Sequence, residues 1–312
     1  MKLIFCGTPR FAVPTFERLI SEGFQIDLVV TNPDEPSGRG YELKQSPVKQ
    51  VAEKAGIPVF QPAKLRTPET QETISRYRPD AIVIVAYGKI VPPWMIELPR
   101  LGCINLHASL LPKYRGAAPI QWALIQGEPT TGITTMKIDP GLDTGDILLQ
   151  REVEVREEDT TETLSERLSE LGAELMIETL HGLDRGEIVP RSQNHAQATL
   201  APMIKKEHGR IDWSMNAEKI ARRVRGLRPW PGAYTTFRGK NLHMWVAVPE
   251  AGSSASPLEP GTILGKEGRL LVACGENSRL ELREVQIEGR KRLQARDFLN
   301  GVRLTPGEKF AP

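Results

Sequence analysis

The sequence predicts an α/β domain built on a doubly wound parallel sheet, followed by a smaller β-rich domain. Two observations predict the first domain: apolar runs alternate with amphipathic helical stretches, and residues 80–86 (DAIVIVA) are apolar without alternation, as in a parallel strand buried on both faces. One observation predicts the second: between residues 233 and 287, short strand-like runs are separated by turns, as in a small barrel or sandwich.

Length and charge also indicate two domains. A chain of 312 residues exceeds a usual single domain, and 39% hydrophobic residues are enough for a substantial core. We expect a first domain over residues 1–189, a linker over 190–208 and a second domain over 209–312. The net charge of +2 hides an asymmetry, since residues 204–312 hold 20 Lys and Arg against 12 Asp and Glu. Such a domain either meets a polyanionic partner or is simply basic.

Several classes of protein and site are disfavoured. No apolar run is long enough for a membrane span, and the first residues enter a strand-like run without signal-peptide organisation, which favours the cytoplasm. Cys6, Cys103 and Cys274 are too few and too far apart for a disulfide framework or a zinc pattern, and the five histidines are equally scattered. We therefore expect no metal.

The first part of the chain alternates strands and helices. Residues 2–6 (KLIFC) form a strand, and the turn after it has one glycine only, so a dinucleotide site is poorly supported. Residues 33–45 are a polar loop rich in Gly and Pro, in which Arg39 lies between two glycines. This pattern suggests a mobile surface element, either a plain solvated loop or one that clamps a ligand. The further strands and helices are expected at residues 11–20, 26–30, 46–55, 57–60 and 68–77.

The rest of the chain completes both domains. Leucines at helical spacing make residues 160–183 the clearest helix, and the polar stretch 190–202 is typical of a linker. In the expected helix 216–226, the three arginines would point largely outward. The remaining strands are expected at residues 132–138, 147–155, 233–237, 242–248, 261–264, 270–273 and 280–287, and a helix at 118–125.

Residues 103–121 (CINLHASLLPKYRGAAPIQ) carry the strongest candidate site. The stretch begins as a buried strand, in which Asn105 and His107 would point to the same face because side chains alternate. Ser109 and Pro112 then turn the chain. Such a pair could merely cap backbone groups, but in an open α/β sheet ligands bind at the carboxyl ends of the strands, where this stretch and residues 87–90 would meet.

Residues 139–146 (DPGLDTGD) form a tight acidic loop between two expected strands. Asp is common in ordinary hairpin turns, so the loop could be purely structural. Alternatively, one of the carboxylates orients His107 or binds a reacting water.

The motifs NLHASLLPKYRGAAPIQ and DPGLDTGDIL closely resemble the folate-dependent formyltransferase family. The start FCGTPRFA, the GRG of residues 38–40, and the later RIDWS and RPWPGAYTTF are similar to the branch of that family that acts on methionyl-tRNA. The resemblance covers nearly the whole chain. It implies a Rossmann-like formyl-transfer domain followed by a small OB-like barrel that contacts tRNA.

The resemblance also implies a set of site residues and partners. The catalytic trio falls on Asn105, His107 and Asp143, and the co-substrate is 10-formyltetrahydrofolate. The initiator methionyl-tRNA would be the acceptor, with Arg39 contacting it, and a monomer is expected. Tyr41 and Glu42 stand where relatives commonly have lysines, which lowers the charge of that loop. The folate contacts fall on Ser109, Leu110, Leu111 and Pro112, with help from Tyr87, Gly88 and Ile90.

The chemistry explains the residue types. Formyl transfer to an amine passes through a tetrahedral intermediate, and a donor aimed at its oxyanion is worth about 3–4 kcal/mol in comparable acyl-transfer sites. The Asn105 amide is such a donor. His107 could donate a second hydrogen bond or accept a proton from the amine, with Asp143 fixing its ring. Both roles remain open at this point.

Four other functions remain as alternatives. Glycinamide ribonucleotide formyltransferase shares the catalytic signature but needs no basic β-rich domain, and a formyltetrahydrofolate hydrolase would use water as acceptor. A non-catalytic RNA-binding protein would have no use for the trio. A nicotinamide dehydrogenase is disfavoured by the single-glycine turn.

Overall fold

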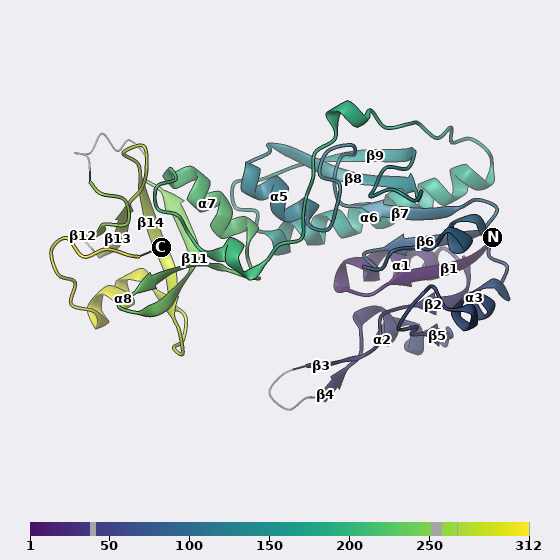
Figure 1. The fold of residues 1–312 in the computed structure, drawn as a ribbon, viewed down its shortest axis with the longest axis horizontal. Helices are drawn as coiled ribbons and strands as arrows, with labels where there is room; N and C mark the ends of the chain where they lie inside the picture. Colours follow the sequence, from purple (N-terminus) through teal and green to yellow (C-terminus); the bar gives the residue numbers. More distant parts are fainter. Residues whose placement is uncertain (38–41, 251–257, 267, 312) are drawn as a thin grey trace. The chain divides into compact units, whose positions relative to one another are not determined.

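The computed structural model describes residues 1–312 except 38–41, 251–257, 267 and 312 (Figure 1). The chain forms two compact units. Unit 1 comprises Met1–Pro119, Thr130–Glu154 and Ser165–Pro202, and unit 2 comprises Ile120–Pro129, Val155–Leu164 and Met203–Pro312. Each unit is made of three separate segments of the sequence. Residues 155–164 join unit 2 because Thr161 and Asp159 are hydrogen-bonded to Gly226 and Arg225 of that unit.

Unit 1 is built on a seven-stranded sheet in the order β5-β2-β1-β6-β7-β8-β9. The first five strands in this order are parallel, and β8 and β9 are antiparallel to their neighbours. The α/β class is therefore confirmed. The strands are β1 (Lys2–Gly7), β2 (Gln25–Val30), β5 (Val59–Phe60), β6 (Ala81–Val85), β7 (Cys103–His107), β8 (Thr130–Lys137) and β9 (Ile147–Glu154).

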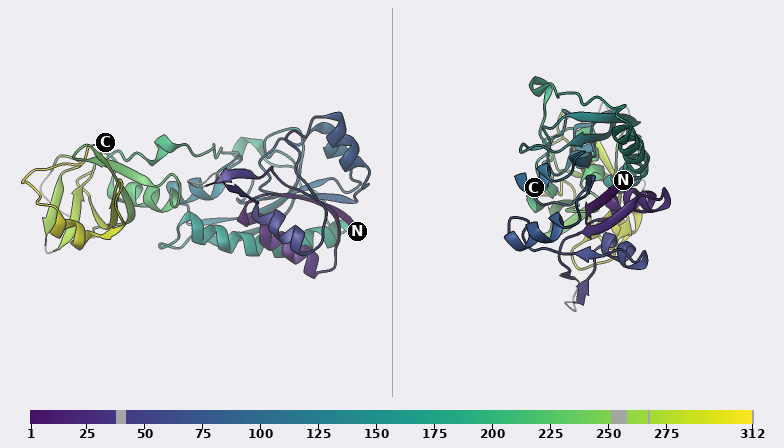
Figure 2. Two further views of the ribbon diagram at one scale, coloured as in Figure 1. Left: turned by 90° about the horizontal axis from the view of Figure 1, so that it is seen from below. Right: turned by 90° about the vertical axis from the view of Figure 1, so that its right-hand side faces the viewer.

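Helices cover both faces of this sheet, as Figure 2 shows. On one face, Phe5 of β1 stacks on Phe16 of α1 at 4.8 Å, and α6 approaches β7 so closely that a Cβ on Gly172 would lie 2.6 Å from Leu106. On the other face, α3 and α4 bury Ile74 and Met95 against the strands. The helices of unit 1 are η1 (Arg10–Ala12), α1 (Val13–Ser21), α2 (Pro47–Lys54), α3 (Pro68–Ser75), α4 (Pro93–Glu97) and most of α6 (Thr161–Asp184). Helix α5 (Pro119–Gln126) belongs to unit 2 except for its first residue, and the first four residues of α6 also belong to unit 2.

The strand order places a topological switch between β1 and β6. From β1 the chain proceeds outward through β2 and β5, and it then returns to β6 and proceeds the other way. In such sheets a ligand site lies outside the carboxyl ends of the strands at this switch. The loops after Gly7 and Val85 therefore flank the expected site, next to the carboxyl end of β7.

The segment 33–45 contains two short strands, whereas the sequence predicted a loop without strands. Its described parts form a hairpin of β3 (Glu35–Ser37) and β4 (Glu42–Lys44), with Glu35 opposite Lys44. Local alternation was too short to reveal these strands. Arg39 and Tyr41 lie outside the described residues.

Unit 2 contains an antiparallel sheet in the order β10-β11-β14-β13-β12, with β15 paired to β14. Its core includes Trp213, Ile220 on helix α7, and Phe310 near the C-terminus. The elements are η3 (Lys206–Gly209), α7 (Ala217–Gly226), β10 (Ala233–Phe237), β11 (Lys240–Pro249), β12 (Ile263–Lys266), β13 (Arg269–Ala273), β14 (Arg279–Ile287), β15 (Leu293–Gln294) and α8 (Ala295–Gly301).

Helix α7 differs from its prediction in the role of its arginines. Arg223 and Arg225 are half-buried, and they donate hydrogen bonds to the backbone carbonyls of His208 (2.6 Å) and Asp159 (2.9 Å). Burial lowers the pKa of both guanidinium groups. The periodicity of the helix identified its inward apolar face, but it could not show that neighbouring backbone would cover its flanks.

Candidate active site

His107 ends β7 and is held in one orientation. Its ring is 5% exposed, and its Nε2 lies 2.9 Å from the backbone oxygen of Tyr114. A carbonyl oxygen only accepts, so Nε2 must carry a hydrogen and donate it. Nδ1 is therefore the nitrogen that can accept or release a proton, and it lies 3.6 Å from Oδ2 of Asp143. The structure thus brings together two members of the predicted trio.

The three carboxylates of the loop 139–146 have different roles. Asp139 accepts hydrogen bonds from the Thr144 hydroxyl and the Gly141 amide, as in an ordinary turn. Asp146 accepts from Ser192 at 3.0 Å. Asp143 alone faces His107, and its Oδ2 also accepts from the Gly116 amide at 2.7 Å. One aspartate of this loop therefore serves an ordinary turn, and another lies against His107, where the proposed orienting role stays a prediction.

Asn105 supplies the third polar group on the same side of the sheet. It lies two residues before His107 in β7, whereas Leu106 between them faces helix α6. The Asn105 side chain is half-buried, and its amide has no hydrogen-bond partner among the described residues. A half-buried amide left unpaired is suited to donate to a bound substrate.

The turn 109–112 is fixed from beneath by β8 and β9. The Thr134 hydroxyl donates to the Ser109 carbonyl at 2.6 Å and accepts from the Leu111 amide at 3.2 Å. The Leu111 side chain is 3% exposed and packs with Met136 and Ile147. Leu110 lies against Gly132, where a Cβ would be 2.5 Å from its Cδ2. Both leucines therefore pack under the turn, which leaves mainly its backbone and Pro112 to face a ligand.

The loop after β6 presents backbone and not the tyrosine ring. Tyr87 is 2% exposed, and burial raises the pKa of its hydroxyl. Its carbonyl accepts from the Asn32 amide at 3.1 Å. Gly88 follows with a φ of +78°, which favours glycine, and the side chain of Ile90 is 77% exposed. This loop thus offers main-chain groups and one exposed apolar side chain beside the switch point.

The segment 190–202, predicted to be a linker, is packed along the site loop in unit 1. The Arg115 amide donates to the Thr199 carbonyl at 2.9 Å, and the Ala201 amide donates to the Arg115 carbonyl at 2.7 Å. A Cβ on Gly116 would lie 2.7 Å from the Ala201 carbonyl oxygen, so this close approach requires glycine. Composition could not reveal such strand-like pairing, because the segment has no apolar period.

The cysteines do not form a nucleophilic centre. Burial raises the pKa of Cys103 to about 12 and that of Cys6 well above its ordinary value, with Cys103 adding to the effect at Cys6. Thiolates are the reactive form, so neither side chain is activated. Neither thiol therefore supports a covalent route through cysteine.

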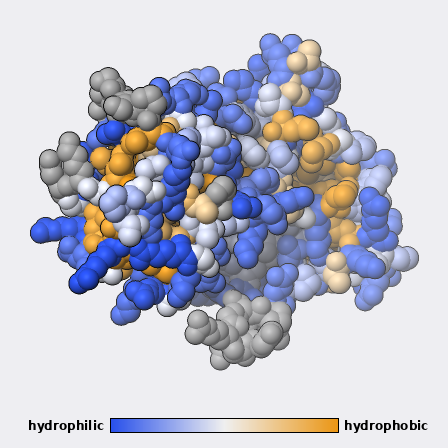
Figure 3. All heavy atoms as spheres, turned by 60° about the vertical axis from the view of Figure 1, so that its left-hand side comes forward, coloured by the Kyte–Doolittle hydropathy of each residue, from blue (hydrophilic) through white to orange (hydrophobic). Residues whose placement is uncertain are grey.

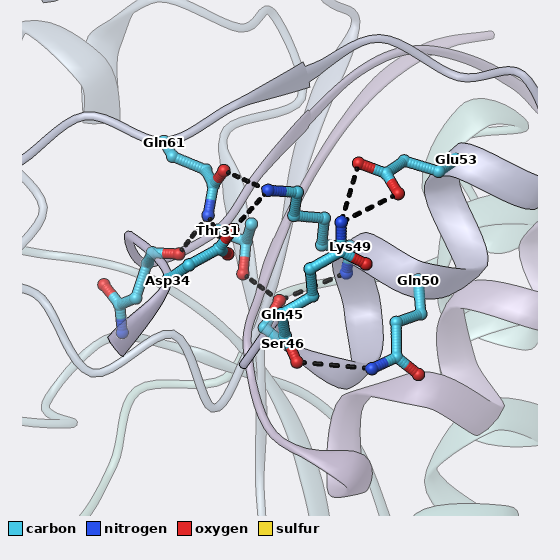
Figure 4. A network of polar contacts seen from close by, with 9 residues as sticks. Thr31, Asp34, Gln45, Ser46, Lys49, Gln50, Glu53 and Gln61 are labelled. Atoms are coloured by element: carbon cyan, nitrogen blue, oxygen red, sulfur yellow. Dashed lines mark hydrogen bonds and ion pairs between the residues drawn. The ribbon is translucent and has the colours of Figure 1, made fainter. Parts of the chain in front are cut away.

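A polar network anchors the root of the β3–β4 hairpin (Figure 4). Lys49 on α2 donates to Asp34 at 2.5 Å and to Gln61 at 2.9 Å, and Gln61 donates to Asp34 at 2.7 Å. The hydrogen bond from Lys49, supported by that from Gln61, holds the pKa of the Asp34 carboxyl below its ordinary value. The network ties the hairpin to α2 and to the end of β5.

Replacing Lys49 by Met should lower the melting temperature most at neutral pH. A carboxylate with a depressed folded pKa contributes stability above its unfolded pKa of about 4, and this contribution is lost as the pH falls through the lower folded value. The difference from wild type should therefore shrink below about pH 4, as measured by thermal melts across pH. Lys54→Met, on the exposed side of the same helix, is the control. A difference that does not change with pH would contradict this account.

The described residues contain no group of three or more His, Cys, Asp or Glu placed to hold a metal ion. Nor does any helix among them combine the length and the apolar character needed to cross a membrane.

Comparisons with known proteins agree with this architecture. The chain is 54% identical to the methionyl-tRNA formyltransferase of Koribacter versatilis, over 99% of this chain and 98% of that protein. Two solved structures share the fold. A Helicobacter canadensis N-formyltransferase in complex with folinic acid and dTDP-3-aminofucose has a TM-score of 0.69 at 18% identity, covering 90% of this chain and 98% of that one. The Clostridium thermocellum methionyl-tRNA formyltransferase has a TM-score of 0.56 at 22% identity, covering 81% and 95%.

Both halves of the chain also match a family of enzymes. Residues 1–180 match the formyl transferase family, and residues 203–303 match the formyl transferase C-terminal domain. Together these matches cover most of the sequence. The chain belongs to the formyl transferase family.

Proposed function

We propose that the chain transfers the formyl group of 10-formyltetrahydrofolate to the free amino group of initiator methionyl-tRNA. The observation that carries the proposal is the similarity to a methionyl-tRNA formyltransferase over 99% of the chain, which includes both units. The product, formylmethionyl-tRNA, would serve translation initiation. A cytoplasmic location and a monomeric state remain predictions that accompany this function.

The trio supports direct attack by the amine. The amine nitrogen bonds to the formyl carbon, the Asn105 amide donates to the resulting oxyanion, and Nδ1 of His107 takes the proton that the nitrogen releases. Collapse then breaks the bond between the formyl carbon and N10 of the folate, and His107 returns the proton to that nitrogen. Asp143 stabilises the charged imidazole while it holds the proton. Since Nε2 donates to Tyr114, a single ring nitrogen performs both transfers.

The folate would lie outside the carboxyl ends of β6 and β7. The backbone of Tyr87 and Gly88 and the exposed Ile90 would contact it on one side, and the turn from Ser109 to Pro112 on the other. Leu110 and Leu111 support that turn from below, so we propose backbone contacts for them in place of side-chain contacts.

The tRNA contacts are proposed for unit 2 and for Arg39, which lies outside the described residues. Phosphate contacts by basic residues provide much of the affinity for nucleic acids and make it sensitive to salt. The half-buried arginines of α7 are already engaged, so other basic side chains must supply these contacts. The face drawn in Figure 3 is largely hydrophilic, with hydrophobic residues gathered in separate patches.

We also infer that the sheet of unit 2 is an OB-like barrel closed by the C-terminal segment. Ala311 exchanges two hydrogen bonds of 2.9 Å with Thr236 on β10. On the other side, Phe310 donates to Gly261 at 2.9 Å, and Ile263 of β12 donates to Glu308 at 2.8 Å. The segment therefore pairs with both edges of the strand order, which supports closure.

Transfer of a labelled formyl group from 10-formyltetrahydrofolate to methionyl-tRNA tests the function. We expect rapid transfer to initiator methionyl-tRNA, none to free methionine, and a KM for the tRNA that rises with salt concentration. The Arg39→Ala chain should show a higher KM for the tRNA and an unchanged KM for the folate. Absence of transfer to the tRNA would refute the function, and transfer to glycinamide ribonucleotide or water would identify one of the alternative activities.

A further inference from the structure

The side chain of Gln193 joins the two loops that meet at His107. It is 5% exposed, and its Nε2 donates to the backbone oxygens of Asp143 (2.9 Å) and Gly145 (2.7 Å). Its Oε1 accepts from Nε and Nη2 of Arg115 at 3.1 and 2.6 Å. The same residue therefore holds the loop of the reacting carboxylate and the loop that carries the Gly116 amide.

The orientation of the Gln193 side-chain amide follows from the chemistry of its partners. A guanidinium group only donates, and carbonyl oxygens only accept, so a flipped amide would face mismatched partners on both sides. Asp143 has a φ of +51°, an uncommon conformation for a residue other than glycine, so hydrogen bonds from other segments are needed to stabilise it. Gln193 donates such a hydrogen bond to the backbone carbonyl of Asp143, and the Gly116 amide donates one to its carboxylate.

A second glutamine, Gln150 on β9, holds the other half of the site. Its Nε2 donates to the Leu111 carbonyl at 2.9 Å and to the Thr134 hydroxyl at 3.0 Å. Thr134 is fully buried and is itself bonded to the carbonyl of Ser109 and the amide of Leu111. Gln150 thus completes the support beneath the turn 109–112, and its two hydrogen bonds go to neither His107 nor Asp143.

We propose that Gln193 and Gln150 are positioning residues that act on separate steps. Gln193 places Asp143 against His107 and so sets the rate of formyl transfer, whereas Gln150 fixes the turn that receives the folate and so sets folate affinity. This inference rests on the proposed function and deepens it. It assigns roles to two side chains outside the reacting trio, one of them in the segment predicted to be a linker.

Two substitutions of Gln193 distinguish the positioning of Asp143 from a role that only anchors Arg115. Gln193→Glu keeps an acceptor for Arg115, but a carboxylate has no N–H for the carbonyls of Asp143 and Gly145. If Gln193 positions Asp143, both Gln193→Ala and Gln193→Glu should lower kcat by about 10²-fold, as expected for a misplaced catalytic group, with KM for the folate unchanged. If Gln193 merely anchors Arg115, the Glu variant should regain the kcat lost in the Ala variant.

Gln150→Ala should show the opposite pattern. The loss of support for the turn should raise the dissociation constant of 10-formyltetrahydrofolate roughly tenfold, measured by tryptophan fluorescence titration, with kcat at saturating folate within about threefold of wild type. Gln286→Ala is the control for both glutamines, since this amide in unit 2 donates to a carbonyl, that of Arg290, as Gln150 and Gln193 do, and accepts from a side chain, that of Trp245, as Gln193 does. It should change neither kcat nor folate binding.

The outcomes distinguish the inference from the function on which it rests. A wild-type chain that transfers no formyl group to methionyl-tRNA refutes the function, and the folate titrations of the variants then still test the separation. In an active wild type, the inference is overturned if Gln193→Glu restores kcat, if the Gln193 variants lose folate binding, or if Gln150→Ala lowers kcat without affecting affinity. Retained folate binding in the Gln193 variants also shows that unit 1 is folded.

Discussion

Asp143→Ala is expected to lower kcat for formyl transfer by about 10²–10⁴-fold, the usual contribution of acid–base catalysis, while leaving folate affinity nearly unchanged. The reason lies in the geometry at His107. Nε2 is committed to the Tyr114 carbonyl, so only Nδ1 can exchange the proton, and Asp143 is the carboxylate 3.6 Å from it. Without that charge, the protonated imidazole loses its stabilising partner. Single-turnover kinetics with saturating folate and methionyl-tRNA would measure the effect.

Two kinds of variant serve as controls: one changes another aspartate of the loop 139–146, and the other changes His107, the partner of Asp143. Asp146→Ala removes a carboxylate bonded to Ser192, away from His107, and should leave kcat within about threefold of wild type. His107→Ala should be as slow as Asp143→Ala, and the double variant little slower than either, because residues that act as a unit are strongly non-additive. Near-normal turnover in either single variant would refute the proposed mechanism.

Phe310→Ala is expected to destabilise unit 2 by about 3–5 kcal/mol, the usual cost of truncating a buried aromatic side chain. Phe310 is 3% exposed, stacks on Trp213 at a centroid distance of 5.7 Å, and meets Phe237 edge-on at 5.5 Å. Its backbone belongs to the C-terminal segment that pairs with both sheet edges. The substitution should therefore loosen the core and the proposed closure together.

Urea unfolding followed by tryptophan fluorescence would measure this loss, because Trp213 lies against Phe310. Leu293→Ala, in the same unit but 37% exposed, should shift the midpoint by little. The unit 1 transition, followed through folate binding, should be unaffected. A Phe310→Ala chain as stable as wild type would show that the C-terminal segment does not hold the sheet together.

The sequence predicted what depends on local pattern. The alternation of apolar runs and helices predicted the α/β class of unit 1, and the unalternated run 80–86 correctly identified a strand buried on both faces. Strand periodicity placed Asn105 and His107 on one face, and the resemblance to formyltransferases added Asp143. The hairpin β3–β4 and the pairing of residues 190–202 were missed, because both are short and lack a period.

Only the tertiary structure decided which polar groups meet. The loop that connects β8 to β9 has three aspartates that the sequence does not distinguish, yet only Asp143 among them faces His107. This follows because hydrogen bonds from Gly116 and Gln193 fix Asp143 in place. The proton-exchanging nitrogen of His107 was likewise decided by the Tyr114 carbonyl. By itself, the sequence determined the fold class, the family and the candidate residues, since these depend on periodicity and motif. Hydrogen bonds between distant segments have no local signature, so the working geometry of the site was decided by the fold.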